Sequence, residues 1–280
     1  VNRNKKCIGL DLRAEEGRLI FHQLAGKTDV IVEELSRVCS GVAVSYAASA
    51  LGSYPLLEYG TEEQKRKYLP DIASGKRLAA FALTEPTAGS DASAIKTTAT
   101  KENGGYVING TKQFITNGGE AEIYTVIALT DKTRGARGAS AFLIEKDTPG
   151  FSFGKKEKKM GIRASSTREL IFRNCLVPEE NMIGREGMGF IVTMRLLDRS
   201  RPGIGAQAVG LAQGALEAAV DYAQKRIQFG HPIISLPVVQ DMLADMAIHV
   251  EAARLLVYAA ARTIDSGAKN FTEESAMAKV

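Results

Sequence analysis

The chain has 280 residues, of which 45% are hydrophobic and 24% are charged, and its formal net charge is +4. This composition is typical of a globular protein with a sizeable core, and the length corresponds to about two domains. The densest basic run, Lys155–Lys159, is interrupted by a glutamate. Such a run is more often a solvated surface than a binding patch, so we expect no nucleic-acid partner.

Cysteine and histidine usage excludes further classes of protein. Cys7, Cys39 and Cys175 are odd in number and widely spaced, which argues against a disulfide framework and favours a reducing compartment. The three histidines form no HxxH or HExxH pattern, so no protein-bound metal is expected. Because no apolar stretch reaches membrane-spanning length and no secretory signal pattern is present, we expect no membrane insertion.

Residues 1–79 carry mostly helical signals. The stretch Thr61-Glu-Glu-Gln64 is a capping box, in which the Thr61 hydroxyl accepts the Gln64 N–H and the Gln64 side chain reaches back. The alanine-rich segment 42–54 predicts a buried helix that ends before Pro55.

Residues 80–184 differ in character, because short β-rich runs alternate with Gly, Asn and Pro. Asn103-Gly104 and Asn109-Gly110 are both hairpin-turn signals. Strands this closely spaced favour a small barrel or sandwich, in which closure removes unpaired edges. The predicted strands cover residues 80–83, 105–108, 111–116, 123–129, 139–145, 151–153 and 169–177.

Residues 185–280 return to helical patterns. Apolar residues at three- and four-residue spacing predict two long helices with bundle-core stripes, one of which includes Met242, Val250 and Val257. The two helices meet at Phe229-Gly-His-Pro232, where Gly and Pro break the pattern, and a third begins near Thr272. Because the third helix has only two turns before Val280, we expect the C-terminal part to be truncated. The order of elements predicts an α+β chain with a partial N-terminal helical domain (1–79), a middle β domain (80–184) and a truncated C-terminal helical domain (185–280).

Six motifs follow one another in a fixed order along the chain. The first is the stretch FALTEPTAGSDASA at residues 81–94, and the others are KQFITNG (112–118), KMGIRASST (159–167), GMGF (187–190), DRSR (198–201) and RIQFG (226–230). Together they resemble the acyl-CoA dehydrogenase family over roughly residues 32–280. The segment 18–28 departs from that family's usual pattern. The resemblance implies the family's fold, FAD as the cofactor, and a homo-oligomer, either a tetramer or a dimer.

The resemblance also implies which residues of the first motif face the flavin. Phe81, Leu83 and Thr84 would contact the isoalloxazine ring at a strand end. Gly89 and Ser90 would lie at the pyrophosphate or the substrate, because glycine permits the close backbone approach that phosphates need.

The other implied contacts come from three later motifs. Phe114 would stack on the flavin and Thr116 would bond near N5, although Phe114 taken alone is equally a core residue.

Arg226, with Phe229 beside it, would bind the pyrophosphate of a neighbouring subunit's FAD, since the guanidinium fork grips phosphate at two points. Asp198 and Arg201 would lie on the substrate side. The alternatives are a solvated arginine beside a turn aromatic at 226–229, and a surface ion pair between Asp198 and Arg201.

The family's reaction requires a carboxylate base that removes the α-proton of an acyl-CoA thioester while a hydride passes to flavin N5. In most members this base is a Glu in a Tyr-Glu-Gly-Thr stretch, which does not occur here, and in others it precedes the arginine that matches Arg201, where this chain has Ser200. We therefore expect no recognisable base among these residues and place it beyond Val280. Glu85 is the alternative acid, but its position at the start of a loop favours a structural role in ordering backbone N–H groups.

The function that the resemblance implies is FAD-dependent α,β-dehydrogenation of an acyl-CoA, in fatty acid metabolism, with electrons passed to an electron-transfer flavoprotein. A short-chain, butyryl-CoA dehydrogenase-like enzyme is the expected subtype. The alternatives are an enoyl-CoA or aryl-enoyl-CoA reductase on the same fold, an acyl-CoA oxidase, and an inactive truncated product without flavin. The expected compartment is the bacterial cytoplasm or the mitochondrial matrix.

Overall fold

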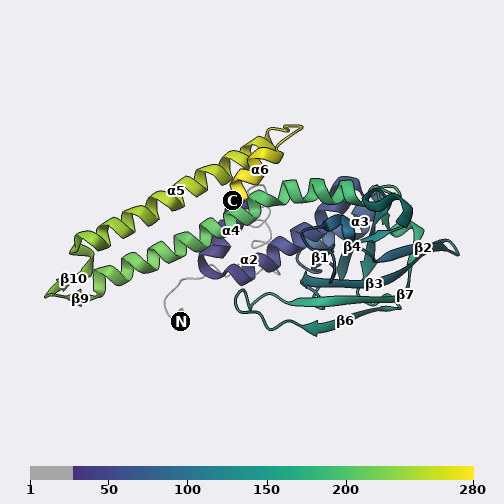
Figure 1. Ribbon diagram of the computed structural model, residues 1–280, viewed down its shortest axis with the longest axis horizontal. Helices are drawn as coiled ribbons and strands as arrows, with labels where there is room; N and C mark the ends of the chain where they lie inside the picture. The colour runs from purple at the N-terminus through teal and green to yellow at the C-terminus, as the bar shows by residue number, and fades with distance from the viewer. Residues whose placement is uncertain (1–27) are drawn as a thin grey trace. The chain divides into compact units, whose positions relative to one another are not determined.

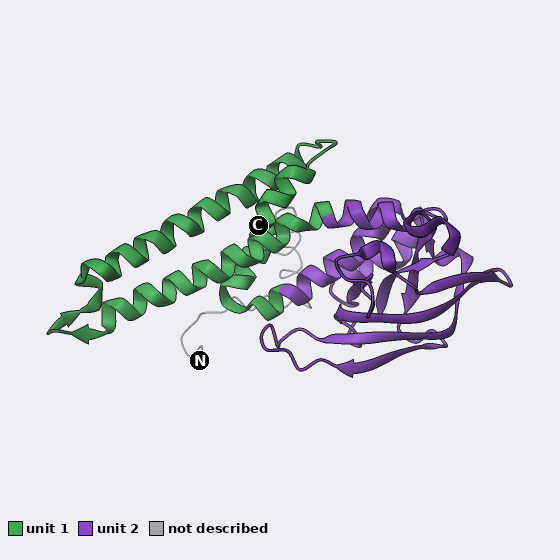
Figure 2. Cartoon of the chain, in the orientation of Figure 1, with its two compact units in different colours: residues 1–43, 198–280 green, residues 44–197 purple. Residues whose placement is uncertain are grey.

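A computed structural model describes the chain from residue 28 to residue 280, so Cys7 and the divergent segment before Thr28 lie outside the described residues. The chain divides into two compact units (Figure 2). One unit contains the described residues up to 43 together with 198–280, and the other contains residues 44–197. The predicted α+β class, with N-terminal helices, a middle sheet and C-terminal helices, is confirmed (Figure 1).

The 44–197 unit is built on one eight-stranded sheet. Along the main path the strands are ordered β6-β7-β3-β2-β4-β5-β8, and β1 joins by pairing in parallel with β4. All other pairings except a short parallel contact of β2 with β4 are antiparallel. The strands are β1 (Ala79–Ala82), β2 (Thr98–Glu102), β3 (Gly105–Thr116), β4 (Ile123–Leu129), β5 (Ala139–Glu145), β6 (Phe151–Lys156), β7 (Thr167–Pro178) and β8 (Met182–Ile183).

One of the two predicted hairpin turns is wrong. Asn103-Gly104 does turn the chain between β2 and β3, with φ values of 44° and 78°. Asn109-Gly110 instead lies inside β3, at an irregularity in its pairing with β7. The glycine is needed there for space, because a Cβ on Gly110 would lie 2.4 Å from the Thr97 hydroxyl oxygen.

The helices agree with the sequence except at Pro55. Helix α2 (Thr28–Tyr59) runs through Pro55, so the predicted end before it is wrong. A proline inside a helix removes one backbone hydrogen bond, but Pro55 and Leu56 are buried, and their burial offsets that loss. Helix α3 (Glu62–Ala73) begins with the predicted capping box, in which both Thr61–Gln64 bonds are present.

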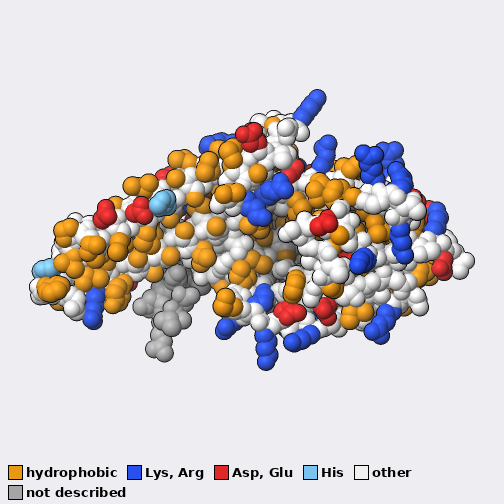
Figure 3. Space-filling view, in the orientation of Figure 1, with side chains coloured by type: hydrophobic (Ala, Val, Ile, Leu, Met, Phe, Trp, Pro, Cys, Tyr) orange, Lys and Arg blue, Asp and Glu red, His pale blue; other side chains and the backbone are white. Residues whose placement is uncertain are grey.

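The C-terminal elements are three helices and a small hairpin: α4 (Gly189–Lys225), β9 (Ile227–Gln228), β10 (His231–Pro232), α5 (Pro237–Asp265) and α6 (Thr272–Lys279). The predicted break at residues 229–232 and the helix start at Thr272 are confirmed. The predicted core stripe of α5 is only partly buried, because Val250 and Val257 are covered while Met242 is 61% exposed. Figure 3 shows apolar side chains along the surfaces of α4 and α5.

Two polar side chains hold the start of β1 and the nearby part of α2 in place within the 44–197 unit. The buried Asn117 amide donates to the carbonyl oxygens of Ser45 and Ala79, at 2.9 and 3.2 Å. Thr125 donates to the carbonyl of Gly52 at 2.7 Å. Because a Cβ on Gly52 would lie 2.6 Å from a backbone atom of β1, this part of α2 packs directly against the strand.

We expect Asn117→Ala to lower the free energy of unfolding by about 2 kcal/mol, since a buried carbonyl oxygen and a half-buried one lose a donor. Alanine also tolerates the φ of 63° at this position less well than asparagine does. Asn103→Ala is the matched control, because Asn103 also has a positive φ, of 44°, but is exposed. Urea unfolding of both variants separates the effect of the lost hydrogen bonds from the effect of alanine at a positive φ. Equal decreases in the free energy of unfolding would contradict a stabilising role of the Asn117 hydrogen bonds.

Among residues 28–280, no helix combines the length and apolarity that a membrane crossing requires. The same residues contain no cluster of three or more His, Cys, Asp or Glu side chains that could hold a metal ion.

Candidate functional site

The end of β1 and the second half of β3 lie side by side and run in opposite directions. The Asn117 amide reaches the carbonyl of Ala79, and further along the Gln113 N–H donates to the carbonyl of Thr84 at 2.8 Å. These two bonds bracket five of the predicted flavin-facing residues. The structure therefore brings together Phe81, Leu83, Thr84, Phe114 and Thr116.

Phe114 lies at a bulge in β3. The pairing of β3 with β7 shifts between Lys112 and Ile115, and Phe114 has a φ of 58°. A bulge re-aims the side chains of the strand that contains it, and here Phe114 is 58% exposed. The alternative that Phe114 is a core residue is wrong. A bulky residue in the left-handed region is strained, and such strain is concentrated at functional sites.

Two hydroxyls at these strand ends have no hydrogen-bond partner within the described part of the chain. They belong to Thr84 and Thr116, both half-buried. A buried or half-buried hydroxyl usually finds a partner, so both are suited to bind a polar ligand edge.

Ser90 and Gly89 lie in the exposed loop beyond, and a Cβ added to Gly89 would meet no atom within 4 Å. The open space there leaves the backbone accessible.

Glu85 has a structural environment. Its carboxylate accepts the N–H of Lys96 at 2.6 Å and that of Thr97 at 3.1 Å, and it forms a 2.7 Å ion pair with Lys112. The side chains of Glu85 and Lys112 are 4% and 0% exposed. The predicted role of Glu85 in ordering backbone N–H groups is confirmed, and its carboxylate is not available as a base.

Burial and pairing act in opposite directions on the two charges. Burial tends to raise the pKa of Glu85, but the Lys112 charge and the three donors outweigh it and lower that pKa below 4.5. For Lys112, burial outweighs the attraction of Glu85 and lowers the pKa to about 8. Both groups are therefore charged at neutral pH.

The predicted substrate-side residues Asp198 and Arg201 pair with each other on the first part of α4 in the 198–280 unit. Asp198 also accepts the Thr272 hydroxyl at 2.9 Å. The alternative of a local ion pair is therefore what the structure shows. Arg226 and Phe229 lie at the α4–α5 hairpin, where both are exposed and Phe229 has 85% of its surface accessible.

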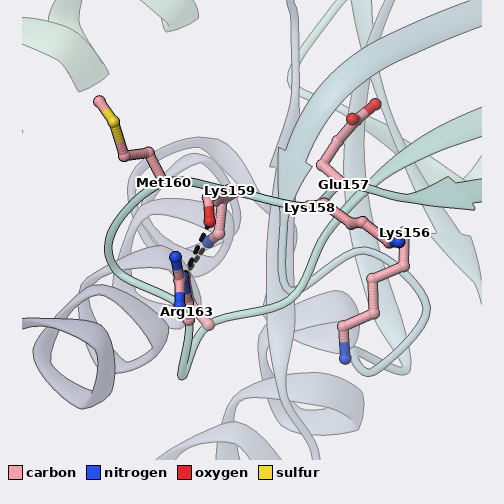
Figure 4. A pocket seen from close by; sticks show the side chains of 7 residues that line it. Lys156, Glu157, Lys158, Lys159, Met160 and Arg163 are labelled. Atoms are coloured by element: carbon pink, nitrogen blue, oxygen red, sulfur yellow. Dashed lines mark hydrogen bonds between the residues drawn. The ribbon is translucent and has the colours of Figure 1, made fainter.

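A hollow of about 560 Å³ lies beside the loop at 156–165 (Figure 4). The loop is internally bonded, because Lys159 donates to the Ser165 hydroxyl at 2.6 Å and Arg163 donates to the Lys159 carbonyl at 3.1 Å. None of the predicted flavin-facing residues lines this hollow. It is a feature of the KMGIRASST loop and not of the strand ends.

Sequence reasoning missed two residues that shape the strand ends. Lys112 was part of a matched motif but had no predicted role, because a lysine in a strand is usually exposed. Asn117 was likewise part of a matched motif without a predicted role. The signal for both is long-range, since their partners lie 27 to 72 residues away in the sequence.

Comparison with known proteins finds three domains of one family along the chain. Residues 26–76, 80–175 and 187–280 match the N-terminal, middle and C-terminal domains of acyl-CoA dehydrogenase. Residues 1–41 also match CoA-transferase family III, mostly outside the described part.

Two curated relatives illustrate the similarity. The chain is 50% identical over 250 residues to a short-chain-specific acyl-CoA dehydrogenase of Megasphaera elsdenii, which covers 89% of this chain and 65% of that protein. It is 49% identical over 253 residues to the NADH acryloyl-CoA reductase of Anaerotignum propionicum, with coverages of 90% and 64%. The chain thus spans about 65% of the length of such relatives.

Solved structures show the same similarity to acyl-CoA dehydrogenases. A chain in the structure described as the electron transferring flavoprotein of Acidaminococcus fermentans is 52% identical, with a TM-score of 0.87 and coverages of 88% and 65%. The acyl-CoA dehydrogenase from Geobacillus kaustophilus is 34% identical, with a TM-score of 0.85 and coverages of 94% and 74%. The FAD complex of PigA is also 34% identical, with a TM-score of 0.85 and coverages of 92% and 69%. The chain belongs to the acyl-CoA dehydrogenase family.

Proposed function

We propose that this chain carries the flavin-facing part of an FAD-dependent acyl-CoA dehydrogenase that acts on a short-chain acyl-CoA. The observation that carries the proposal is the juxtaposition of β1 and β3, which gathers the free hydroxyls of Thr84 and Thr116 beside the exposed ring of Phe114. The polar edge of a flavin needs hydrogen-bond donors and its ring needs an aromatic or apolar surface, and these residues fit both needs.

The residues have separate roles in this proposal. Phe81, Leu83 and Phe114 would contact the flavin ring, and the hydroxyls of Thr84 and Thr116 would hydrogen-bond its edge. FAD, when bound, supplies the redox chemistry by accepting a hydride, while the protein supplies position and electrostatics. Gly89 and Ser90 would lie against the phosphates or the substrate thioester. Glu85 is not the base, because its carboxylate is buried and fully bonded.

Residues from the 198–280 unit of a second copy of the chain would complete the site. The exposed Arg226 and Phe229 would bind the pyrophosphate of a neighbouring subunit's FAD, and Asp198 and Arg201 would lie on the substrate side. Apolar side chains exposed along α4 and α5, including Leu211 and Ile248, support a homo-oligomer. The domain division at 1–79, 80–184 and 185–280 is part of the proposal, and the three family matches fall within it.

The proposed electron acceptor is an electron-transfer flavoprotein, supported by the similar chain in a structure described by that name. A second candidate is the reverse reaction, reduction of an enoyl-CoA, because one relative at 49% identity is an acryloyl-CoA reductase. The proposed compartment is the bacterial cytoplasm or the mitochondrial matrix.

The test is an FAD titration of the purified chain followed by addition of butyryl-CoA. Bleaching of the flavin absorption by butyryl-CoA supports action on this acyl-CoA and enoyl-CoA pair. Because crotonyl-CoA reoxidises the reduced flavin by the reverse of the same step, turnover decides the direction, and NADH-dependent reduction of crotonyl-CoA would support the reductase. A chain that binds no FAD contradicts the proposal.

One substitution tests the strand-end site directly. We expect Thr84→Val to weaken FAD binding about tenfold, since the flavin edge loses one hydrogen bond while the side-chain shape is kept. Thr100→Val is the matched control, because Thr100 is an exposed threonine on β2. Equal FAD dissociation constants for the two variants would remove Thr84 from the site.

A further inference from the structure

Consecutive residues of β3 hold the carbonyl groups of consecutive residues after β1. The Lys112 ammonium donates to the carbonyl of Leu83 at 2.9 Å, and the Gln113 N–H donates to that of Thr84 at 2.8 Å. Both carbonyls are therefore directed to β3. The N–H and hydroxyl of Thr84 donate no hydrogen bond within the described residues. The bonds to β3 fix the direction in which these free groups point.

Lys112 links this contact to the loop that follows. Its ammonium also binds Glu85 at 2.7 Å, and Glu85 in turn accepts the backbone N–H groups of Lys96 and Thr97. One buried cation thus connects β3 to the residues after β1. Through Glu85 it also reaches residues 96–97, which immediately precede β2. Only two residues further along β3 lies the strained bulge at Phe114.

A contribution to stability alone does not account for this buried pair. A buried ion pair pays a large desolvation cost, and apolar residues of similar volume stabilise a fold equally well or better. What apolar residues cannot supply is a directed hydrogen bond to the Leu83 carbonyl. Lys112, unlike an apolar residue, therefore fixes the geometry of the strand ends.

We propose that Lys112 is a positioning residue for the flavin site. Its ammonium holds the Leu83 carbonyl and the Glu85 carboxylate against β3, so that the free groups of Thr84 and the exposed ring of Phe114 keep one fixed arrangement. This inference rests on the proposed function, in that the ligand of the strand ends is FAD. Lys112 itself does not touch the flavin in this proposal, because its ammonium is fully buried and bonded to the protein.

The test compares Lys112→Met with Phe142→Leu. Phe142 is equally buried and pairs with Met182 on the β5–β8 side of the sheet, so it controls for loss of stability. In the FAD-free chain we expect Lys112→Met to speed amide exchange at Gln113, Lys96 and Thr97 by about tenfold relative to the rest of the sheet, since one charge-assisted bond is lost. Phe142→Leu should show no such local effect.

The second measurement is the affinity and absorption spectrum of bound FAD. Lys112→Met should bind FAD at least about tenfold more weakly than the wild type and shift the flavin bands, while Phe142→Leu keeps the wild-type spectrum. Lys112→Arg, which retains a donor to Leu83, should restore part of the affinity. A Lys112→Met chain with wild-type affinity and spectrum overturns the inference. If the wild type itself binds no FAD, the proposed function and the flavin part of this inference fail together, and the amide exchange still decides whether Lys112 positions the strand ends.

Discussion

Gly210→Ala is expected to lower the free energy of unfolding by about 3 kcal/mol, because it forces a methyl group into a backbone contact. Gly210 lies on α4 and faces α2 within the unit that contains residues 198–280. A Cβ at this position would lie 2.0 Å from the carbonyl oxygen of Glu33 and 2.8 Å from its carbonyl carbon. Backbone atoms cannot rotate away as a flexible side chain can, so the two helices would have to separate.

The separation would also disturb a buried charge. Glu33 is 4% exposed, and its carboxylate accepts Arg254 Nε at 2.8 Å and the Tyr258 hydroxyl at 2.8 Å. A movement of α2 that weakens these bonds leaves a carboxylate poorly paired inside the protein, which is costly. The helix-propensity gain of about 1 kcal/mol from replacing a glycine by alanine is smaller than these losses.

Gly203→Ala is the matched control on the same helix, and the expected sign is opposite. The nearest atom to a Cβ on Gly203 is a carboxylate oxygen of Asp29 at 3.5 Å, an ordinary contact distance. Alanine should therefore raise the free energy of unfolding by roughly 0.5–1 kcal/mol through its lower backbone entropy in the unfolded chain. Urea unfolding measures both variants. If Gly210→Ala is as stable as Gly203→Ala, the close approach of α2 and α4 at Glu33 is wrong.

Sequence reasoning succeeded where the signals are local. The capping box at Thr61 involves residues three apart, and β4 and β5 have the predicted bounds because each is an apolar run between turn signals. It failed where a distant segment decides. Asn109-Gly110 has the composition of a hairpin turn, but the glycine makes room for Thr97, which immediately precedes β2. Pro55 is kept inside a helix by burial, which the local rule does not include.

The candidate site shows the same division. The motif around residues 81–91 predicted a strand end followed by a loop, and it directed attention to Thr84 and away from Glu85. The bulge that exposes Phe114 could not be predicted, because it arises from the pairing of β3 with β7, some 50 residues later in the chain. The burial of Lys112 could not be predicted either, because it depends on Glu85, and the local sequence around a lysine does not indicate a distant partner.

The coupling between Glu85 and Lys112 gives the second large expected effect. We expect Glu85→Gln and Lys112→Met each to lower the free energy of unfolding by about 3–5 kcal/mol at pH 7, because each leaves a buried charge without its partner. The double variant should lose about 1–3 kcal/mol less than the sum of the two, since its buried groups no longer include an unpaired charge. The exposed pair Lys101 and Glu179, at 2.7 Å, is the control, and its coupling should stay below about 1 kcal/mol.

The pH dependence of this cycle distinguishes an ion pair from simple packing. The pKa of Glu85 is lower in the folded chain than its ordinary value of 4.5, so its contribution to stability is fully present above about pH 4.5 and is lost as the pH falls through the folded value. The difference in unfolding free energy between the wild type and Glu85→Gln should therefore stay constant from pH 7 to about pH 4.5 and shrink as the pH falls further. Lys112→Met should retain less of this acid sensitivity, because the charge that lowers the Glu85 pKa is gone. A wild-type advantage that is constant from pH 7 to the acid limit of folding would mean that the carboxylate contributes by shape and not by charge.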